Sequence, residues 1–175
     1  MNAPESTSMT ILVADDEDSI RFVLREALEA EGHRVNEVPD GESALDALNS
    51  NQFDLAFLDI RMPGSSGLEI LDHLRSTGSD TAVVIITAQN TMENAVEAMK
   101  RGALDYLVKP FSLAQVSALV ERAQSTRVLQ NQIQVLRREA QGSKRPGNDR
   151  LVGRSPALLE IFKLVGKVAV RNVPV

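Results

Sequence analysis

Five short apolar runs alternate with amphipathic segments between residues 10 and 112, and this alternation constrains the fold more than any other feature. Most of the runs are aliphatic or β-branched, and three are apolar at successive positions, as strands buried on both faces must be. Strands that alternate with helices form βαβ units, so we predict an α/β fold with a five-stranded, parallel, doubly wound sheet. The predicted strands cover residues 11–14, 33–38, 55–58, 82–86 and 106–108.

The segments between the runs have the spacing of amphipathic helices. Ser19 is the expected cap of a helix that runs to about Ala30, with Gly32 just past its end. A last, extended helix begins near Ser112, and because no Gly or Pro follows before Gly142, we expect it to be about 30 residues long. The remaining helices are expected over residues 41–48, 68–74 and 91–100.

The second half of the extended helix has an apolar stripe that a small domain cannot cover. Leu129, Ile133 and Leu136 follow one another at spacings of four and three, which is the pattern of a coiled-coil seam. We therefore predict a homodimer whose seam is formed by these three residues. A solvated helix extension without a partner is the alternative, although an unpartnered apolar stripe is a liability.

The chain divides into segments of different composition. A tail at residues 1–9, expected to be disordered, precedes a domain at residues 10–123. Residues 124–150 are expected to form the coiled-coil-like extension and then a linker, because residues 141–149 are QGSKRPGND. Residues 151–175 contain a helix start at Ser155 and Pro156 but are too few to form a core, so we interpret them as the beginning of a second domain.

The composition excludes several kinds of site. There is no cysteine, which excludes disulfides, zinc–thiolate sites and cysteine nucleophiles and is typical of a reducing cytoplasm. We expect His33 and His73 at the surface, without a metal role. No apolar run is long enough to cross a bilayer and the N-terminus lacks a signal-peptide pattern, so we expect a cytoplasmic protein without membrane contact.

Charge is distributed unevenly along the chain, whose formal net charge is −5. Residues 1–120 carry 20 acidic and 8 basic side chains, whereas residues 121–175 carry 4 acidic and 11 basic ones. An acidic domain repels nucleic acid, and the basic segment has neither interleaved aromatic residues nor a known reader motif. We therefore expect no direct nucleic-acid binding by this chain.

Polar residues follow the predicted strands at the carboxyl edge of the sheet, where open parallel sheets bind ligands. Asp15 and Asp16 follow the first strand, Asp59 the third, Thr87 the fourth and Lys109 the fifth. Carboxylates gathered without His or Cys select a hard cation, so we predict a Mg²⁺ site. The hydroxyl and ammonium groups would bind phosphoryl oxygens, and a carboxylate can be the nucleophile that forms an aspartyl-phosphate.

Other interpretations of these residues fit less well. Carboxylates at strand ends can simply cap the following helices, but capping does not account for Lys109. An aspartate-nucleophile phosphatase of the haloacid dehalogenase type would need an acid two residues after Asp59, where this chain has Arg61. A flavodoxin-type cofactor site would need hydroxyl groups in place of the DDEDS loop, and the chain has no P-loop with a Lys-Ser/Thr pair.

On these motifs the chain resembles the response-regulator receiver domains, whose CheY-like, flavodoxin-like fold has five βα units. The runs SIRFVLREAL, DIRMPG and GALDYLVKPF resemble more narrowly the NtrC group of sigma-54-dependent activators, and LVGRSPALLEIFKLVGKVA at 151–169 resembles the beginning of their AAA+ ATPase module. The residues that carry the receiver resemblance are Asp15, Asp16, Asp59 in LDIRMPGSSGLE, Thr87 in ITA, Tyr106, and Lys109 in KPF.

The resemblance implies a role for each of these residues. Asp59 would accept phosphate from a sensor histidine kinase. Asp16, Asp59 and the backbone carbonyl of Arg61 would bind magnesium directly, and Asp15 would bind it through a water. Tyr106 would swing inward when Thr87 moves, and the Lys109–Pro110 bond would be cis. The phosphoryl-binding and switch positions would be Thr87, Ala88, Lys109 and Tyr106.

The resemblance also implies the context of the domain. Phosphorylation in a two-component system would switch a dimeric module of a longer protein with AAA+ and DNA-binding domains. That protein would be an ATPase acting on RNA polymerase with sigma-54, and nitrogen regulation is the use the NtrC group implies. The present segment would be no enzyme beyond accepting phosphate and losing it slowly. A receiver attached to a different output domain is the alternative.

Overall fold

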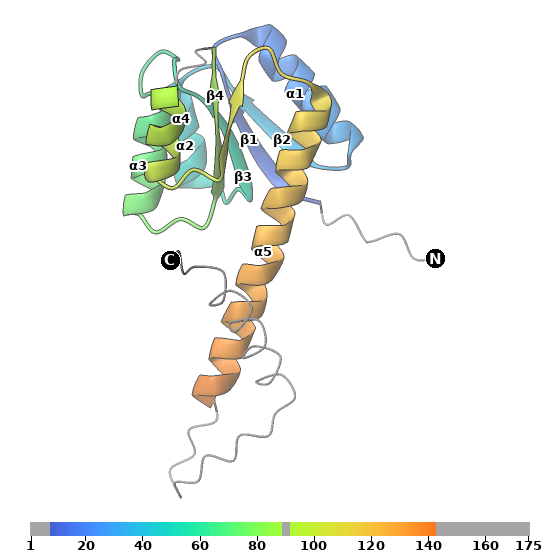
Figure 1. Ribbon diagram of the computed structural model, residues 1–175, viewed down its shortest axis with the longest axis vertical. Coiled ribbons are helices and arrows are strands. Elements are labelled where there is room, and N and C mark those ends of the chain that lie inside the picture. Colours follow the sequence, from blue (N-terminus) through green and yellow to red (C-terminus); the bar gives the residue numbers. More distant parts are fainter. Residues whose placement is uncertain (1–7, 89–91, 143–175) are drawn as a thin grey trace, which may run out of the picture. The chain divides into compact units, whose positions relative to one another are not determined.

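The computed structural model describes residues 8–88 and 92–142 and has the predicted α/β architecture (Figure 1). Five parallel strands form one sheet in the order β2-β1-β3-β4-β5, which confirms the predicted sheet. The strands are β1 (Thr10–Ala14), β2 (Arg34–Val38), β3 (Leu55–Asp59), β4 (Ala82–Thr87) and β5 (Asp105–Val108). The helices are α1 (Asp18–Ala30), α2 (Gly41–Ser50), α3 (Gly67–Ser76), α4 (Met92–Lys100) and α5 (Leu113–Gly142).

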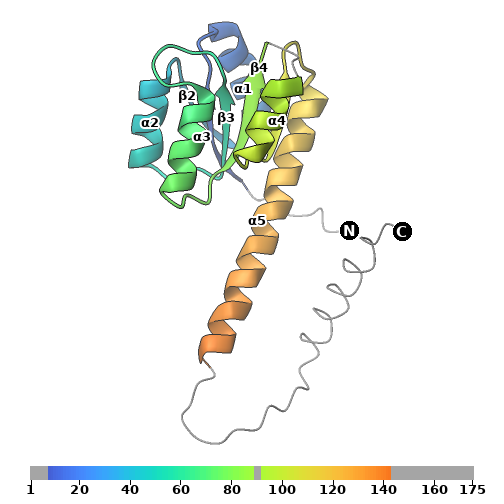
Figure 2. The same ribbon diagram turned by 60° about the vertical axis from the view of Figure 1, so that its left-hand side comes forward.

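Helices cover both faces of the sheet, and alternate strand residues point into two separate cores (Figures 1 and 2). On one face, Ile11 and Val13 of β1 pack with residues of α1 and α5. On the other face, Leu12 and Ala14 pack with residues of α2, α3 and α4. The central strands β1, β3 and β4 are therefore buried on both sides, which explains why their apolar residues are consecutive.

The register of the strands aligns their carboxyl ends. Asp59 at the end of β3 pairs with Ile86 of β4, and Thr87 at the end of β4 pairs with Val108 of β5. The residues that follow the strands consequently meet at one edge of the sheet. By contrast, β2 lies at a side edge of the sheet and is mostly exposed, which explains its weaker apolar pattern.

Side-chain capping sets the start of helices α2 and α3, whereas helix α1 starts at a different residue from the one predicted. The Asp40 carboxylate accepts a hydrogen bond from the Ser43 backbone N–H at 2.7 Å and caps α2. Helix α3 begins with a reciprocal capping box, in which a serine and the glutamate three positions later bond each other's backbone. Helix α1 begins at Asp18, with Glu17 rather than Ser19 at its N-cap, and the Glu17 side chain makes no capping hydrogen bond.

Helix α5 has the predicted extent and a change of environment along its length. Its first turns pack against the sheet through residues such as Val116 and Val120. Farther along, Leu129 and Ile133 are 60% and 49% exposed, so the domain leaves these two predicted seam residues uncovered. The third, Leu136, lies outside the residues whose side chains are described.

The chain divides into two compact units, Met1–Val135 and Leu136–Val175, and the whole sheet belongs to the first. Most of the predicted tail, at residues 1–7, and the predicted second-domain segment, with the linker from residue 143, lie outside the described residues. Among the helices of the described part, none is both long and apolar enough to cross a membrane.

His33 is buried, so the prediction that it lies at the surface was wrong. It is 6% exposed, and its Nδ1 accepts a hydrogen bond from the backbone N–H of Met9 at 3.3 Å. The ring sits where the start of β1 meets the turn after α1, and it satisfies a backbone donor that would otherwise be buried without a partner. His73 is half-buried and contacts Asn49.

Candidate functional site

Lys109 and three carboxylates meet at the carboxyl edge of the sheet. The Lys109 ammonium donates hydrogen bonds to Asp15 Oδ1 at 3.1 Å, to Glu17 Oε1 at 2.7 Å and to Asp59 Oδ2 at 2.8 Å. An ammonium has three N–H donors, so these contacts use all of them. The structure thus brings together Asp15, Asp59 and Lys109, as the strand-end argument predicted.

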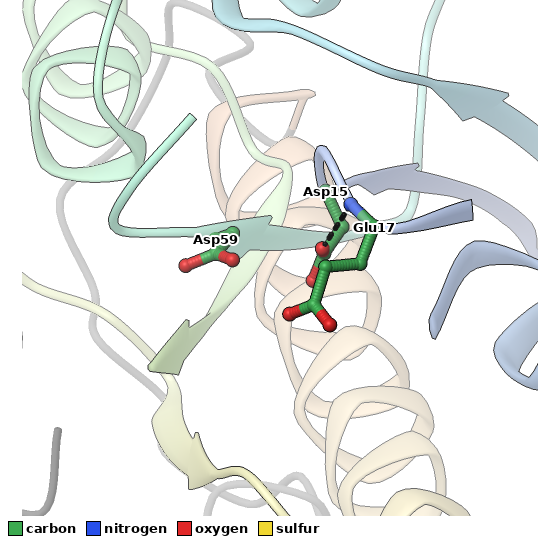
Figure 3. Close-up of side chains that lie close together, drawn as sticks. All are labelled: Asp15, Glu17 and Asp59. Carbon is green, nitrogen blue, oxygen red and sulfur yellow. Dashed lines mark hydrogen bonds between the residues drawn. The ribbon is translucent and has the colours of Figure 1, made fainter. Parts of the chain in front are cut away.

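Glu17 belongs to this cluster although it was not predicted from the sequence. Figure 3 shows its side chain beside those of Asp15 and Asp59, and one carboxylate oxygen from each residue lies within 4.8 Å of the others. The backbone N–H of Glu17 also donates to Asp15 Oδ1 at 2.9 Å. The available signal was the acidic run itself, because a residue two positions after a strand-end carboxylate can turn back to the same edge.

Asp16 and Arg61 are the two residues predicted to bind magnesium directly together with Asp59. The Asp16 side chain is exposed and is not part of the three-carboxylate cluster. Arg61 contacts Asp59 through its backbone N–H, which donates to Asp59 Oδ1 at 3.0 Å. Asp15 and Asp59 are both buried, at 0% and 5% exposure, so they are the acids that the fold holds in place.

The predicted phosphoryl-binding and switch residues lie on or next to β4 and β5. Thr87 is buried at the end of β4, and its carbonyl accepts a hydrogen bond from the Lys109 backbone N–H at 2.8 Å. Ala88 follows it and is exposed, and Tyr106 on β5 is 38% exposed. The Lys109–Pro110 bond is cis, as the resemblance implied.

Burial and charge oppose each other at Asp15 and Lys109. Burial raises the pKa of Asp15, and hydrogen bonds from Lys109 and from the Glu17 backbone reduce this rise without cancelling it. Burial also disfavours the charged form of Lys109, but its hydrogen bonds to Asp15, Asp59 and Glu17 outweigh that effect and raise its pKa. One firmly charged ammonium therefore faces three carboxyl groups.

The donor set fits a hard divalent cation. Asp15 Oδ2 is buried, and the Lys109 ammonium lies 2.8 Å from it in an ion pair. Three carboxylates around a single ammonium leave an excess of negative charge, which a metal ion would neutralise. Because all the side-chain ligand atoms are oxygens, Mg²⁺ suits the cluster better than a metal that prefers nitrogen or sulfur.

Comparisons of the amino-acid sequence show which known proteins this chain resembles. The family model described as "Response regulator receiver domain" matches residues 11–121. The DNA-binding transcriptional regulator NtrC of Salmonella typhimurium is 37% identical over 165 residues, and the regulatory protein AtoC of Escherichia coli is 33% identical over 165 residues. Both matches cover 94% of this chain but 34% and 35% of the relatives, so the chain spans about a third of their length.

Solved structures give the same result. The receiver domain of the Francisella response regulator 1452 has a TM-score of 0.65 and 32% identity, and the match covers 68% of this chain and 99% of that one. NtrX from Brucella abortus has a TM-score of 0.70 and 34% identity, with 93% of this chain and 35% of that one covered. The match therefore covers nearly all of the isolated domain, whereas NtrX is much longer than this chain.

Proposed function

The chain belongs to the response regulator receiver family, and on that premise we propose that it is the phosphoacceptor module of a two-component system with Asp59 as the phosphorylated residue. A sensor histidine kinase is the proposed phosphoryl donor. The observation that carries the proposal is the position of Asp59, which is buried at the end of β3 with its Oδ2 2.8 Å from the Lys109 ammonium.

The proposed reaction is phosphoryl transfer to a carboxylate oxygen. An Asp59 oxygen bonds to phosphorus as the P–N bond of the phosphohistidine breaks, and the imidazole, protonated on its other nitrogen, leaves as a neutral ring. Such transfers depend mainly on positioning and on neutralising charge. Lys109 supplies fixed positive charge, and the Arg61 backbone N–H holds the Asp59 carboxylate in orientation through Oδ1.

Magnesium is the proposed cofactor, and when bound it supplies positive charge against the phosphoryl oxygens. Asp59, Asp16 and the backbone carbonyl of Arg61 would hold it directly, and Asp15 would hold it through a water. The excess of carboxylates over positive charge around Lys109 supports a cation at this position. Asp16 is exposed outside the carboxylate cluster, so its assignment rests on the family resemblance alone.

Thr87, Ala88 and Lys109 are the proposed phosphoryl-binding residues once Asp59 is modified. The proximity of Thr87 to Lys109 supports this, since the Thr87 carbonyl accepts the Lys109 backbone N–H at the same sheet edge. Tyr106 is proposed to move inward when Thr87 does, and because it is 38% exposed on β5, such a movement would bury apolar surface.

We further propose that this switch acts in a longer regulator of the NtrC type. The matches to NtrC and AtoC cover 94% of the chain, which is more than the receiver family match at residues 11–121. Residues 151–175 would begin an AAA+ ATPase domain that acts on sigma-54 RNA polymerase, with a DNA-binding domain beyond it. Nitrogen regulation is part of this proposal, and this chain by itself is proposed to be no enzyme.

A homodimer through the second half of α5 is the proposed assembly. The exposure of Leu129 and Ile133 supports it, because burying each apolar side chain contributes about 1.5–3 kcal/mol. We expect the double substitution Leu129→Asp and Ile133→Asp to produce a monomer in sedimentation experiments at several concentrations. The exposed neighbour Gln132→Asp is the control, and a double variant as dimeric as the wild type would place the seam elsewhere.

Labelling with a small acyl phosphate tests the phosphoacceptor. We expect the wild-type chain to take up phosphate in the presence of magnesium and the Asp59→Asn variant to take up none. Asp46→Asn removes an exposed carboxylate on α2 and should leave labelling unchanged. Undiminished labelling of Asp59→Asn would overturn the assignment of Asp59.

A further inference from the structure

The side chain of Glu17 does not cap helix α1, although Glu17 is the N-cap residue of that helix. Its backbone carbonyl begins α1 by accepting hydrogen bonds from Ile20 and Arg21. Side chains at an N-cap usually accept bonds from the first backbone N–H groups of the helix, but the Glu17 carboxylate accepts none. Its Oε1 instead lies 2.7 Å from Lys109 Nζ, so helix capping does not explain where this carboxylate points.

The three acceptors of Lys109 are not equivalent. Asp15 and Asp59 have side chains that are 0% and 7% exposed, so an ammonium that left either of them would leave a buried carboxylate without its ion pair. The Glu17 side chain is 54% exposed and can return to water at little cost. Glu17 is therefore the partner that Lys109 can release most easily.

We propose that Glu17 is a specificity-determining residue at this sheet edge. Its carboxylate accepts the third N–H of Lys109, which weakens the binding of a phosphoryl-like anion, and its charge strengthens the binding of a divalent cation. The proposal rests on the proposed function of Asp59. A phosphoryl group there can receive a Lys109 donor only after a present acceptor is released, because all three N–H groups are in use. The Glu17 charge also attracts a divalent cation and repels an anion.

This role predicts effects of opposite sign on the two ligands. Removing the Glu17 carboxylate frees a Lys109 donor and removes a repulsive charge, so a phosphoryl-like anion should bind more tightly. The same change removes one negative charge from the carboxylates that face the proposed cation, so magnesium should bind more weakly. Each effect should be on the order of three- to fivefold, because an exposed charge contributes modestly. A residue that only supported the fold would weaken both ligands together.

Two binding titrations on the full chain test this inference. Calorimetry with Mg²⁺ alone measures the cation, and beryllium fluoride at saturating Mg²⁺ measures the anion. Glu17→Ala should weaken the first and strengthen the second. Glu17→Gln, which loses the charge but keeps an acceptor for Lys109, should weaken Mg²⁺ similarly and strengthen the anion less. Glu29→Ala removes an exposed carboxylate elsewhere on α1 and should change neither affinity.

The outcomes separate this inference from the function on which it rests. If wild-type chain binds no beryllium fluoride in saturating Mg²⁺, both the proposed function and the inference fail. If the wild type binds it but Glu17→Ala and Glu17→Gln both match Glu29→Ala, or weaken both ligands, the function stands and the role of Glu17 is overturned. Opposite shifts in the two affinities support the role.

Discussion

Replacing Lys109 with glutamine removes the ammonium that lies among three carboxylates. In the metal-free protein Asp15 and Asp59, both buried, then face Glu17 and each other without that positive charge. Removing one partner of a buried ion pair costs about 3–5 kcal/mol, and the half-exposed contact to Glu17 adds little. We therefore expect Lys109→Gln to lower the free energy of unfolding by roughly 3 kcal/mol in EDTA at neutral pH.

Urea unfolding followed by far-ultraviolet circular dichroism suits this chain, which has no tryptophan and one tyrosine. Magnesium should stabilise the variant more than the wild type, because the cation takes over the neutralisation that the ammonium provided. A ligand at a hundred times its Kd stabilises by about 2.7 kcal/mol. Lys100→Gln, exposed in the last turn of α4, is the matched control and should stay within about 0.5 kcal/mol of wild type.

The pH dependence of this loss follows from Asp15. Burial already raises its pKa above the ordinary 3.8, and removing Lys109 raises it further. A carboxyl group whose pKa is raised on folding destabilises the folded state above that pKa, and this cost declines as the pH falls through it. The deficit of Lys109→Gln should therefore be smaller at an acidic pH at which Asp15 is protonated than near pH 8. If the urea unfolding curve of Lys109→Gln in EDTA matches that of the wild type at both pH values, this reasoning is refuted.

Three further substitutions test the packing near the site and elsewhere. Gly67→Ala would place a Cβ 2.4 Å from the Asp59 carbonyl oxygen and should cost about 1–3 kcal/mol in urea unfolding. His33→Leu leaves the Met9 N–H without its acceptor and should also cost about 1–3 kcal/mol at neutral pH. Asp40→Ala should destabilise α2 above pH 3.8, and because a backbone N–H lowers the Asp40 pKa, thermal melts should show this loss disappearing as the pH falls through that lowered value. A variant indistinguishable from wild type would contradict the corresponding contact.

Much of the fold could be predicted because burial dictates sequence directly. Strands β1, β3 and β4 are covered on both faces, so their residues are apolar at consecutive positions, with one polar residue at an end of each strand. Strand β2 could be located mainly from its place between two helices, since a strand at the side of the sheet buries little. Gly32 marks the end of α1 because its φ of +89° is strained for any residue with a side chain.

The site could be predicted in outline but not in every ligand. Parallel strands that end at one edge place Asp15, Asp59 and Lys109 together, whatever the loops do. Which member of the acidic run turns inward depends on where α1 begins, and a start at Asp18 directs Glu17 to Lys109. His33 was mispredicted for a similar reason, because its burial depends on a contact between segments that are distant in the sequence.

The most direct test of the central claim is to locate the phosphoryl group on the wild-type chain. The chain is treated with a small acyl phosphate and magnesium, and the aspartyl-phosphate that forms on the protein is then reduced with borohydride. The modified peptide is identified by mass spectrometry. We predict that Asp59 is the residue modified and that EDTA prevents the modification. Modification of Asp15, Asp16 or Glu17, or of a hydroxyl side chain while Asp59 stays intact, would contradict the claim.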